Sequence, residues 1–272
     1  MAALRNVQSS RCPGPKSPTG PRARYKAYAA AALFLALLSG DAVVADPVPG
    51  QRPVVVELFT SQACYSCPPA EAFLGELAER RDVIALEFHV DYWNDLVYGS
   101  AGQWKDPFSD PAYSQRQRLY AQHLESSRVY TPQMVIAGTH DAVGSRRRAV
   151  LNAIALAQSA GPHPLTVKVE SRRDRSLRVF LDGDLPAGGT VWLARFKRAK
   201  VTDVVAGENK GKTLANHNIV TELRAIGDWS GRASSIELAK PGLAADEGCA
   251  ILVQNADLGP FLGAAYCPEV AS

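Results

Sequence analysis

The sequence has little of what marks nucleic-acid-binding, membrane-spanning or repetitive proteins. Its formal net charge of +3 comes from the N-terminus, where residues 1–45 hold six basic residues and one acid. From residue 46 onward, 24 basic residues face 26 acidic ones, which gives no electrostatic basis for a nucleic-acid partner. No apolar run after residue 45 is long enough to span a bilayer, and no internal repeat or low-complexity tract occurs.

Cysteine is also scarce. The chain has five, and Cys12 lies in the N-terminal segment, which leaves Cys64, Cys67, Cys249 and Cys267. If the chain is exported, as its first 45 residues suggest below, an even number of cysteines predicts two disulfides, although four cysteines allow three pairings. There is no second Cys-x-x-Cys motif and no paired histidine spacing that would complete a zinc site. We therefore expect no metal and no cofactor, and keep metal binding or delivery by the Cys-x-x-Cys motif as an alternative function.

The first 45 residues have the pattern of a targeting segment. A basic region without acids precedes the apolar run from Ala27 to Leu38, and Val43-Val44-Ala45 fits a small-x-Ala cleavage site. The run is short for a membrane span, which favours a cleaved signal peptide over an uncleaved anchor. We expect residues 1–45 to be a signal peptide with its n-region, and the mature protein to be periplasmic or secreted.

One stretch carries a specific chemical signal. Residues 54–58 are apolar except for Glu57, as in a central strand covered on both faces. Cys64-Tyr-Ser-Cys67 follows, and then Pro68-Pro69, which is tolerated only in the first turn of a helix. Apolar residues recur at helical spacing from Ala70 to about Arg80. A strand, a Cys-x-x-Cys motif and a helix in this order are typical of a redox dithiol.

The two cysteines are expected to have different roles. A helix N-terminus stabilises a thiolate, so Cys64, upstream and nearer solvent, is expected to attack and Cys67 to resolve the mixed disulfide. Glu57 on a buried strand would have a raised pKa and is a candidate proton acceptor for Cys67. The alternatives are an inert structural disulfide and a Glu57 carboxylate in water at a sheet edge.

A second strand is predicted from Val83 to Val90, and together with the first strand and helix it makes a βαβ unit with parallel strands. His89 and Asp91 lie two residues apart at its C-terminal end, where open α/β sheets carry their ligand crevice. They are candidates for orienting a substrate thiol, moving a proton or binding a metal. A hydrogen-bonded structural histidine is the alternative.

The rest of the chain divides in two by pattern. Before residue 161 we expect a long, functional or partly structured loop at 91–111, a helix at 112–126, a short strand near 134–138 with a hairpin partner near 141–143, and a helix at 145–158. After the linker at 161–164, alternation with period 2 predicts strands at 165–169, 177–181, 190–196, 219–223, 235–238, 250–254 and 261–266. The expected domains are 46–160, an α/β domain, and 161–272, a small antiparallel β-sandwich or barrel.

Two further motifs have structural interpretations. Cys249 and Cys267 flank a turn-like segment, so in a hairpin they would face one another and form a structural disulfide, which we favour over a second redox pair. Gly207-Glu-Asn-Lys-Gly211-Lys-Thr213 is similar to a phosphate-binding loop, but it has three residues between the glycines where that motif needs four. We interpret it as a hairpin loop.

These motifs together carry a resemblance to a family. The segment from Val54 through the Cys-x-x-Cys motif, His89-Val-Asp91-Tyr-Trp93 and Val129-Tyr-Thr-Pro-Gln-Met134 resemble a bacterial secreted, thioredoxin-like family catalogued as domain of unknown function 1223. The wider resemblance, to thioredoxin-fold proteins, implies that Cys64 and Cys67 occupy the redox position and that Thr131-Pro132 is the cis-proline turn opposite. It also implies that Glu57 is the buried acid of the strand. Pro68 departs from the thioredoxin pattern, because it makes Cys67 the expected N-cap and leaves Cys64 outside the helix.

The function expected from the sequence is that of an exported thiol–disulfide oxidoreductase that acts on protein or small-molecule thiols and disulfides. A thioredoxin-like scaffold that binds a partner without catalysis is a further alternative, because a fold does not dictate a function. The residues do not indicate whether the dithiol oxidises, reduces or isomerises its substrate.

Overall fold

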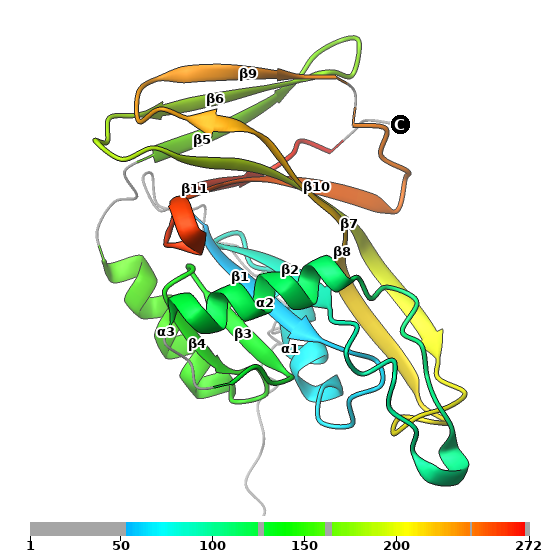
Figure 1. Cartoon of the computed structure of the whole chain (residues 1–272). Coiled ribbons are helices and arrows are strands. Elements are labelled where there is room, and N and C mark those ends of the chain that lie inside the picture. The colour runs from blue at the N-terminus through cyan, green and yellow to red at the C-terminus, as the bar shows by residue number, and fades with distance from the viewer. Residues whose placement is uncertain (1–52, 125–127, 161–164, 240, 270–272) are drawn as a thin grey trace, which may run out of the picture. The chain divides into compact units, whose positions relative to one another are not determined.

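The computed structural model describes residues 53–124, 128–160, 165–239 and 241–269 (Figure 1). The predicted signal peptide and Cys12 therefore lie outside the described residues. Residues 45–272 group into one compact unit, and all the described residues belong to it. Strands from both sides of the expected boundary at residue 161 contribute to one large sheet, so the sheet continues across that boundary.

The chain begins with the predicted βαβ unit. Strand β1 (Val54–Thr60) leads through the Cys-x-x-Cys turn into helix α1 (Pro68–Ala78), which returns to strand β2 (Val83–His89). The two strands are parallel and paired along their whole length, and every residue of both is buried. Strands covered on both faces have the near-continuous apolar composition seen here, and the βαβ prediction is confirmed.

The next segment builds the other helices. After a one-turn 3-10 helix, η1 (Gly99–Ala101), come α2 (Pro111–His123), the hairpin β3 (Gln133–Ile136) and β4 (His140–Val143), and α3 (Arg147–Ser159). Helix α2 starts where the Asp110 side chain accepts a hydrogen bond from the Ala112 N–H at 2.8 Å and Pro111 occupies the first position. The predicted helices and hairpin are confirmed, and the predicted last residue of α2, Ser126, lies outside the described residues.

The second half is composed of strands. They are β5 (Leu165–Ser171), β6 (Leu177–Gly183), β7 (Gly189–Asp203), β8 (Thr213–Trp229), β9 (Ser234–Leu238), β10 (Glu247–Gln254) and β11 (Phe261–Tyr266), with a 3-10 turn, η2 (Ala256–Leu258), before the last. All of the expected strands are present. Strands β7 and β8 run much further than predicted. Their outer ends pair as a hairpin that exposes apolar residues such as Val201 and buries amides such as Asn216 and Asn218, so the sequence there gives no alternating hydrophobic signal.

The strands form two sheets. The large sheet has the order β11-β10-β7-β8-β2-β1-β3-β4, and β5, β6 and β9 form a separate sheet. Strand β8 adjoins β2 through a single parallel pair, Glu87 with Ile219. The Cys-x-x-Cys turn therefore follows the C-terminal end of β1, in the part of the sheet where β1, β2 and β8 lie in succession.

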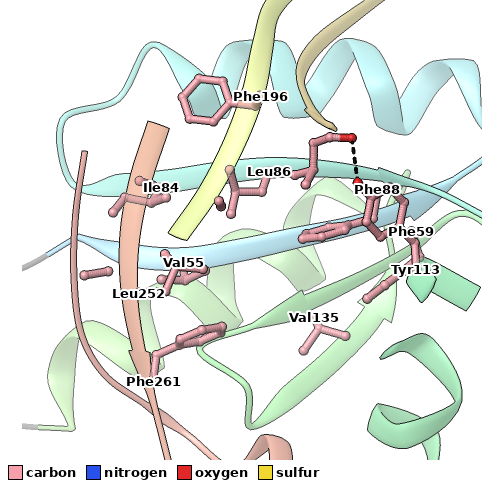
Figure 2. Close-up of a cluster of buried hydrophobic side chains, with 14 of the residues drawn as sticks. Val55, Phe59, Ile84, Leu86, Phe88, Tyr113, Val135, Phe196, Leu252 and Phe261 are labelled. Atoms are coloured by element: carbon pink, nitrogen blue, oxygen red, sulfur yellow. Dashed lines mark hydrogen bonds between the residues drawn. The ribbon is translucent and has the colours of Figure 1, made fainter. Parts of the chain in front are cut away.

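Three apolar cores hold these layers together. Alternate residues of β1 face opposite ways, so Val54, Val56 and Leu58 pack with α1 and α3 while Val55 and Phe59 pack with α2 and β10. Figure 2 shows this second core, in which Phe59 stacks on Phe88. The third core lies between the β5-β6-β9 sheet and strands β7, β10 and β11, seen as stacked layers in Figure 1.

Candidate functional site

The site begins with a disulfide between Cys64 and Cys67. Cys67 is the N-cap of α1, as predicted, although its backbone has helical angles despite the proline that follows it. Both cysteines have no exposed surface, whereas Tyr65 and Ser66 between them are exposed. The expectation that Cys64 lies nearer solvent is therefore wrong for the disulfide form, because the loop turns its intervening residues outward and the sulfurs inward.

The two prolines change what the helix start offers the dithiol. Pro68 and Pro69 occupy the first helical positions and have no N–H groups. The next two N–H groups, of Ala70 and Glu71, donate to the Cys67 carbonyl at 2.8 and 3.1 Å. Since free N–H groups are a large part of how a helix N-terminus stabilises a thiolate, this helix gives less stabilisation than the sequence pattern predicts.

The Cys-x-x-Cys turn is held by a loop far away in the sequence. This segment, residues 204–212, joins β7 to β8 and is called the latch loop below. The buried Asn209 amide donates to the carbonyls of Gln62 at 2.8 Å and Cys64 at 2.9 Å. Glu208 accepts from the Tyr65 N–H at 2.8 Å, and the Lys212 ammonium lies 4.2 Å from the Tyr65 ring centroid. The hairpin-loop prediction for 207–213 is confirmed, but its contact with the dithiol had no signal in the sequence.

Beneath the turn lies a set of buried ionisable side chains: Glu71 of α1, Glu87 and His89 of β2, and Asp106 of the long loop, called the acidic cluster below. His89 Nδ1 lies 2.7 Å from Asp106 Oδ2, and His89 Nε2 lies 3.3 Å from Glu87 Oε1 without hydrogen-bonding alignment. Asp106 also accepts the Gln62 N–H at 2.7 Å, which ties the cluster to the dithiol turn.

Burial and charge set the protonation of this cluster. Burial lowers the pKa of His89, but the carboxylates of Asp106 and Glu87 outweigh it and hold that pKa well above the usual value. Burial raises the pKa of Asp106, but His89 and hydrogen bonds hold it below its usual value. Burial, reinforced by Glu87, raises the pKa of Glu71 to about 8. At neutral pH, Glu71 is thus a neutral carboxylic acid beside an ionised His89–Asp106 pair.

Glu71 lies near Cys67 on helix α1. It lies four residues after Cys67 on α1, so the two side chains share one face of the helix. Its carboxyl oxygen accepts a hydrogen bond from the Thr60 hydroxyl at 2.7 Å, at the end of β1. It is a proton-holding group in the first turn of the helix that Cys67 caps.

Strand β8 completes the cluster with amides. Asn216 donates to Glu87 Oε1 at 2.8 Å and accepts from the Gln62 amide at 3.0 Å, and the His217 N–H donates to Glu87 Oε2 at 2.8 Å. Gln62 Oε1 and Trp104 Nε1 are buried without a hydrogen-bond partner among the described residues. The cluster is therefore a continuous polar interior that links β2, β8 and the dithiol turn.

Glu57, the proton acceptor predicted from the sequence, is not brought to the dithiol. It alternates along β1 with Val56 and Leu58, which pack on α1, so its side chain lies on the opposite face of the sheet. There it pairs with Arg116 Nε at 2.9 Å and accepts a hydrogen bond from the Tyr120 hydroxyl. Glu57 is fully buried, so the alternative of a carboxylate in water at a sheet edge is wrong. Arg116 of α2 supplies the counter-charge that a buried carboxylate needs.

The remaining predicted residues are divided between the site and the scaffold. The Thr131–Pro132 bond is cis, and since Gln133 pairs with Phe59, Pro132 lies next to the end of β1. Asp91 does not pair with His89, which binds Asp106. The Asp91 carboxylate accepts a hydrogen bond from the Ser114 hydroxyl of α2. Cys249 and Cys267 form a disulfide, as the hairpin predicted.

Some of the site was missed by sequence reasoning. Glu71, Glu87, Asp106, Asn209 and Asn216 were not singled out. Glu87 had a signal, a charge inside an apolar strand like that of Glu57, and the glycine-flanked segment at 207–213 marked the latch loop. Within the part of the chain that the structure describes, no group of three or more His, Cys, Asp or Glu is arranged to hold a metal ion. No described helix has the length and apolar character of a membrane span.

Comparison with known proteins places the chain. The family described as "Protein of unknown function (DUF1223)" matches residues 55–254, which is most of the 272-residue chain. The chain belongs to the DUF1223 family. The matched residues begin in β1 and include the dithiol, the acidic cluster and the latch loop. No curated protein matches the sequence.

A solved structure is similar to this DUF1223 member. The crystal structure of protein AGR_C_4864 from Agrobacterium tumefaciens shares 27% sequence identity with it at a TM-score of 0.68. The similarity covers 80% of this chain and 97% of that one. Neither the family description nor the name of that protein indicates a reaction, so a function has to be argued from the site.

Proposed function

We propose that this DUF1223 protein is an exported, thioredoxin-like thiol–disulfide oxidoreductase whose redox group is Cys64–Cys67. The observation that carries the proposal is a disulfide at the N-cap of a helix after a central parallel strand, with the neutral acid Glu71 on the same helix face. The parallel β1–α1–β2 unit with the β3–β4 hairpin beside β1 supports the thioredoxin-like comparison. The predicted leader supports export to the periplasm or the medium.

The exchange proceeds in two steps. A substrate thiolate attacks Cys64 Sγ, the Cys64–Cys67 bond breaks, and Cys67 leaves with the electron pair. A second substrate thiolate attacks the substrate sulfur of the mixed disulfide and releases Cys64 as a thiolate. The substrate thiols are oxidised to a disulfide while the dithiol gains two electrons and two protons. The reverse sequence reduces a substrate disulfide, and the partners are protein or small-molecule thiols.

Glu71 is the proton donor in this scheme. Its carboxyl gives its proton to the Cys67 thiolate as that sulfur leaves, and solvent restores the proton. A pKa of about 8 lets it hold the proton at neutral pH and release it to a thiolate whose usual pKa is close to that value. In the reverse direction Glu71 accepts the proton of the Cys67 thiol, which is the role that the sequence predicted for Glu57.

Both sulfurs are fully buried, so the structure around the dithiol has to open before substrate reaches them, and we expect the latch loop to control that opening. Asn209→Ala removes the two hydrogen bonds that hold the carbonyls of Gln62 and Cys64. Each is worth about 1 kcal/mol, so we expect reduction of Cys64–Cys67 by dithiothreitol to become about 10- to 30-fold faster. Stopped alkylation with mass spectrometry measures the rate. Lys210→Ala in the same loop is the control, and equal rates in the two variants would contradict a latch.

Insulin reduction tests the proposed function. We expect the mature protein to turn over insulin with dithiothreitol as reductant, Cys64→Ser/Cys67→Ser to lose turnover, and Cys249→Ser/Cys267→Ser to keep it. The reduction potential of Cys64–Cys67 is read in glutathione buffers by the same alkylation. A potential below about −300 mV without turnover marks a structural disulfide and ends the proposal.

A further inference from the structure

Two surface cavities meet at the second disulfide, Cys249–Cys267. One, of about 320 Å³, is lined by Arg175, Arg198 and both cysteines, among others. The other, of about 420 Å³, is lined by Arg198, His217 and the same cysteines. Cavities of this size accept small molecules. The second lies at the end of α1 away from the Cys-x-x-Cys turn, because Ala78 and Glu79 line it.

The two disulfides differ in how they meet solvent. Cys64 and Cys67 have no exposed surface, whereas Cys267 is partly exposed and Cys249 is 2% exposed. Access of a thiol to a sulfur governs the rate of exchange, and exposed disulfides are the labile ones. Cys267 is the more exposed residue of the pair, so we take its sulfur as the one that a small thiol attacks and Cys249 as the leaving group.

The cavities hold charges of both signs. Glu269 lines both, Glu247 lines the first and is already paired with Arg195 and Lys197, and Glu79 lines the second, so a ligand carboxylate competes with these acids for the arginines. Arg198 lines both, and its ion pair with Glu269 is long, 3.8 Å, with a Glu269 side chain that is 87% exposed. Such surface pairs contribute little stability, so a carboxylate of a ligand replaces Glu269 at small cost. Arg175 lines the first cavity from the turn between β5 and β6. Two guanidinium groups thus lie beside one accessible disulfide.

A third arginine is placed for the leaving sulfur. Cys249 of β10 pairs directly with Arg195 of β7, and residues directly opposite in an antiparallel pair share one face, with Cβ atoms about 5 Å apart. Arg195 binds Glu222 and Glu247, but its Nε is buried without a hydrogen-bond partner among the described residues. A thiolate on Cys249 would be a charged acceptor close to this donor.

We propose that Cys249–Cys267 is a second exchange site, one that takes small anionic thiols of the carboxylate-bearing peptide class. The thiolate of the ligand attacks Cys267 Sγ and the Cys249–Cys267 bond breaks. Cys249 leaves as a thiolate beside Arg195 and takes a proton from solvent, so Cys267 carries the ligand as a mixed disulfide. A second ligand thiolate attacks the ligand sulfur, releases the ligand disulfide and leaves both cysteines reduced. This site does not depend on the Cys64–Cys67 function.

The charge of the thiol tests the proposal on the full mature protein without mutation. Oxidised protein is mixed with glutathione, which is anionic, or cysteamine, which is cationic, at equal thiolate concentrations, and then quenched and alkylated for mass spectrometry. We expect glutathione to modify Cys267 before either cysteine of the Cys64–Cys67 pair reacts, and about tenfold faster than cysteamine does at low salt. Arg198→Gln is expected to bring that ratio towards one.

Arg147→Gln, an exposed arginine on α3, is the matched control and is expected to leave the ratio unchanged. Equal rates for the two thiols in the wild type would show an accessible disulfide without an anion site and overturn the proposal. Modification of Cys64 or Cys67 first, or of Cys249 in place of Cys267, would overturn it as well. Because the wild-type comparison uses only the native chain, it decides the proposal even if the Arg198 variant misfolds.

Discussion

Glu71→Gln is expected to stabilise the protein at neutral and alkaline pH. The folded-state pKa of Glu71 is about 8 against an ordinary value of 4.5, so the unfolded chain ionises this group while the folded one keeps its proton. The contribution of Glu71 to the free energy of unfolding is full below pH 4.5 and is lost as the pH rises through 8. Glutamine has no proton to lose, so we expect the variant to exceed the wild type by about 3 kcal/mol at pH 7.

Urea unfolding at pH 5 and pH 7.5 measures this effect. The advantage of Glu71→Gln is expected to be small at pH 5 and to grow with pH, because only the wild type ionises on unfolding. Glu76→Gln, an exposed position on the same helix, is the control and should show no such growth. An advantage that stays constant between the two pH values would contradict a buried neutral acid at Glu71.

The same variant separates the two candidate proton groups. We expect the rate at which Cys64–Cys67 is reduced to change with pH as the Glu71 carboxyl loses its proton. Glu71→Gln has no such proton, so its rate is expected to lack this pH dependence. Glu57→Gln, whose side chain lies on the other face of the sheet, is expected to keep it. Loss of the dependence in Glu57→Gln alone would restore the prediction made from the sequence.

Arg116→Met is expected to destabilise the protein by about 3–5 kcal/mol. Arg116 is 6% exposed and is the cation that pairs with the fully buried Glu57, so the substitution leaves a buried carboxylate without its counter-charge. The guanidinium also donates to Gln254 at 2.9 Å, which joins α2 to β10. Urea unfolding at pH 7 measures the change in the free energy of unfolding.

Two further variants show whether the loss comes from the unpaired charge. Glu57→Leu/Arg116→Met removes both charges and is expected to recover most of the stability, since a buried pair exchanged for apolar side chains is close to neutral. Arg147→Met breaks the exposed pair with Glu76, whose side chains are 50% and 59% exposed, and should change the stability far less than Arg116→Met does, because solvent screens exposed pairs. If Arg116→Met behaves like Arg147→Met, the buried pair does not hold α2 on the sheet.

The fold was predictable wherever a hydrophobic period marked an element, as in β1, α1 and the alternating strands of the second half. The period of β1 put Val55, Glu57 and Phe59 on one face but did not say which helix covers it, so Glu57 was expected beside Cys67 when it faces α2. Glu71 in the first turn of α1 has the pattern of a residue that merely favours the helix dipole. Its burial follows from β2 and the long loop, which no local pattern encodes.

The latch loop was out of reach for a different reason. Asn209 and Cys64 are separated by 145 residues, and their contact depends on the register of the long β7–β8 hairpin. The outer part of this hairpin exposes Val201 and buries Asn216 and Asn218, the reverse of an amphipathic pattern, so neither the length of the hairpin nor the place of its tip was predictable. The Cys249–Cys267 pairing, by contrast, followed from a local hairpin and needed no long-range information.

The short pairing between β2 and β8 affects how rigidly the two halves of the large sheet are connected. One backbone pair joins the two strands. The side chains of Glu87, Asn216 and Asn218 make further hydrogen bonds between β2 and β8. Hydrogen bonds between backbone groups do not depend on the charge of a side chain. Hydrogen bonds to a carboxylate are stronger than those to a neutral carboxyl group, so the connection through Glu87 depends on its charge. Part of the connection between the two halves of the large sheet therefore consists of side-chain hydrogen bonds that belong to the acidic cluster, beside the shared apolar core, and a change of charge in the cluster is expected to change the stiffness of the sheet there.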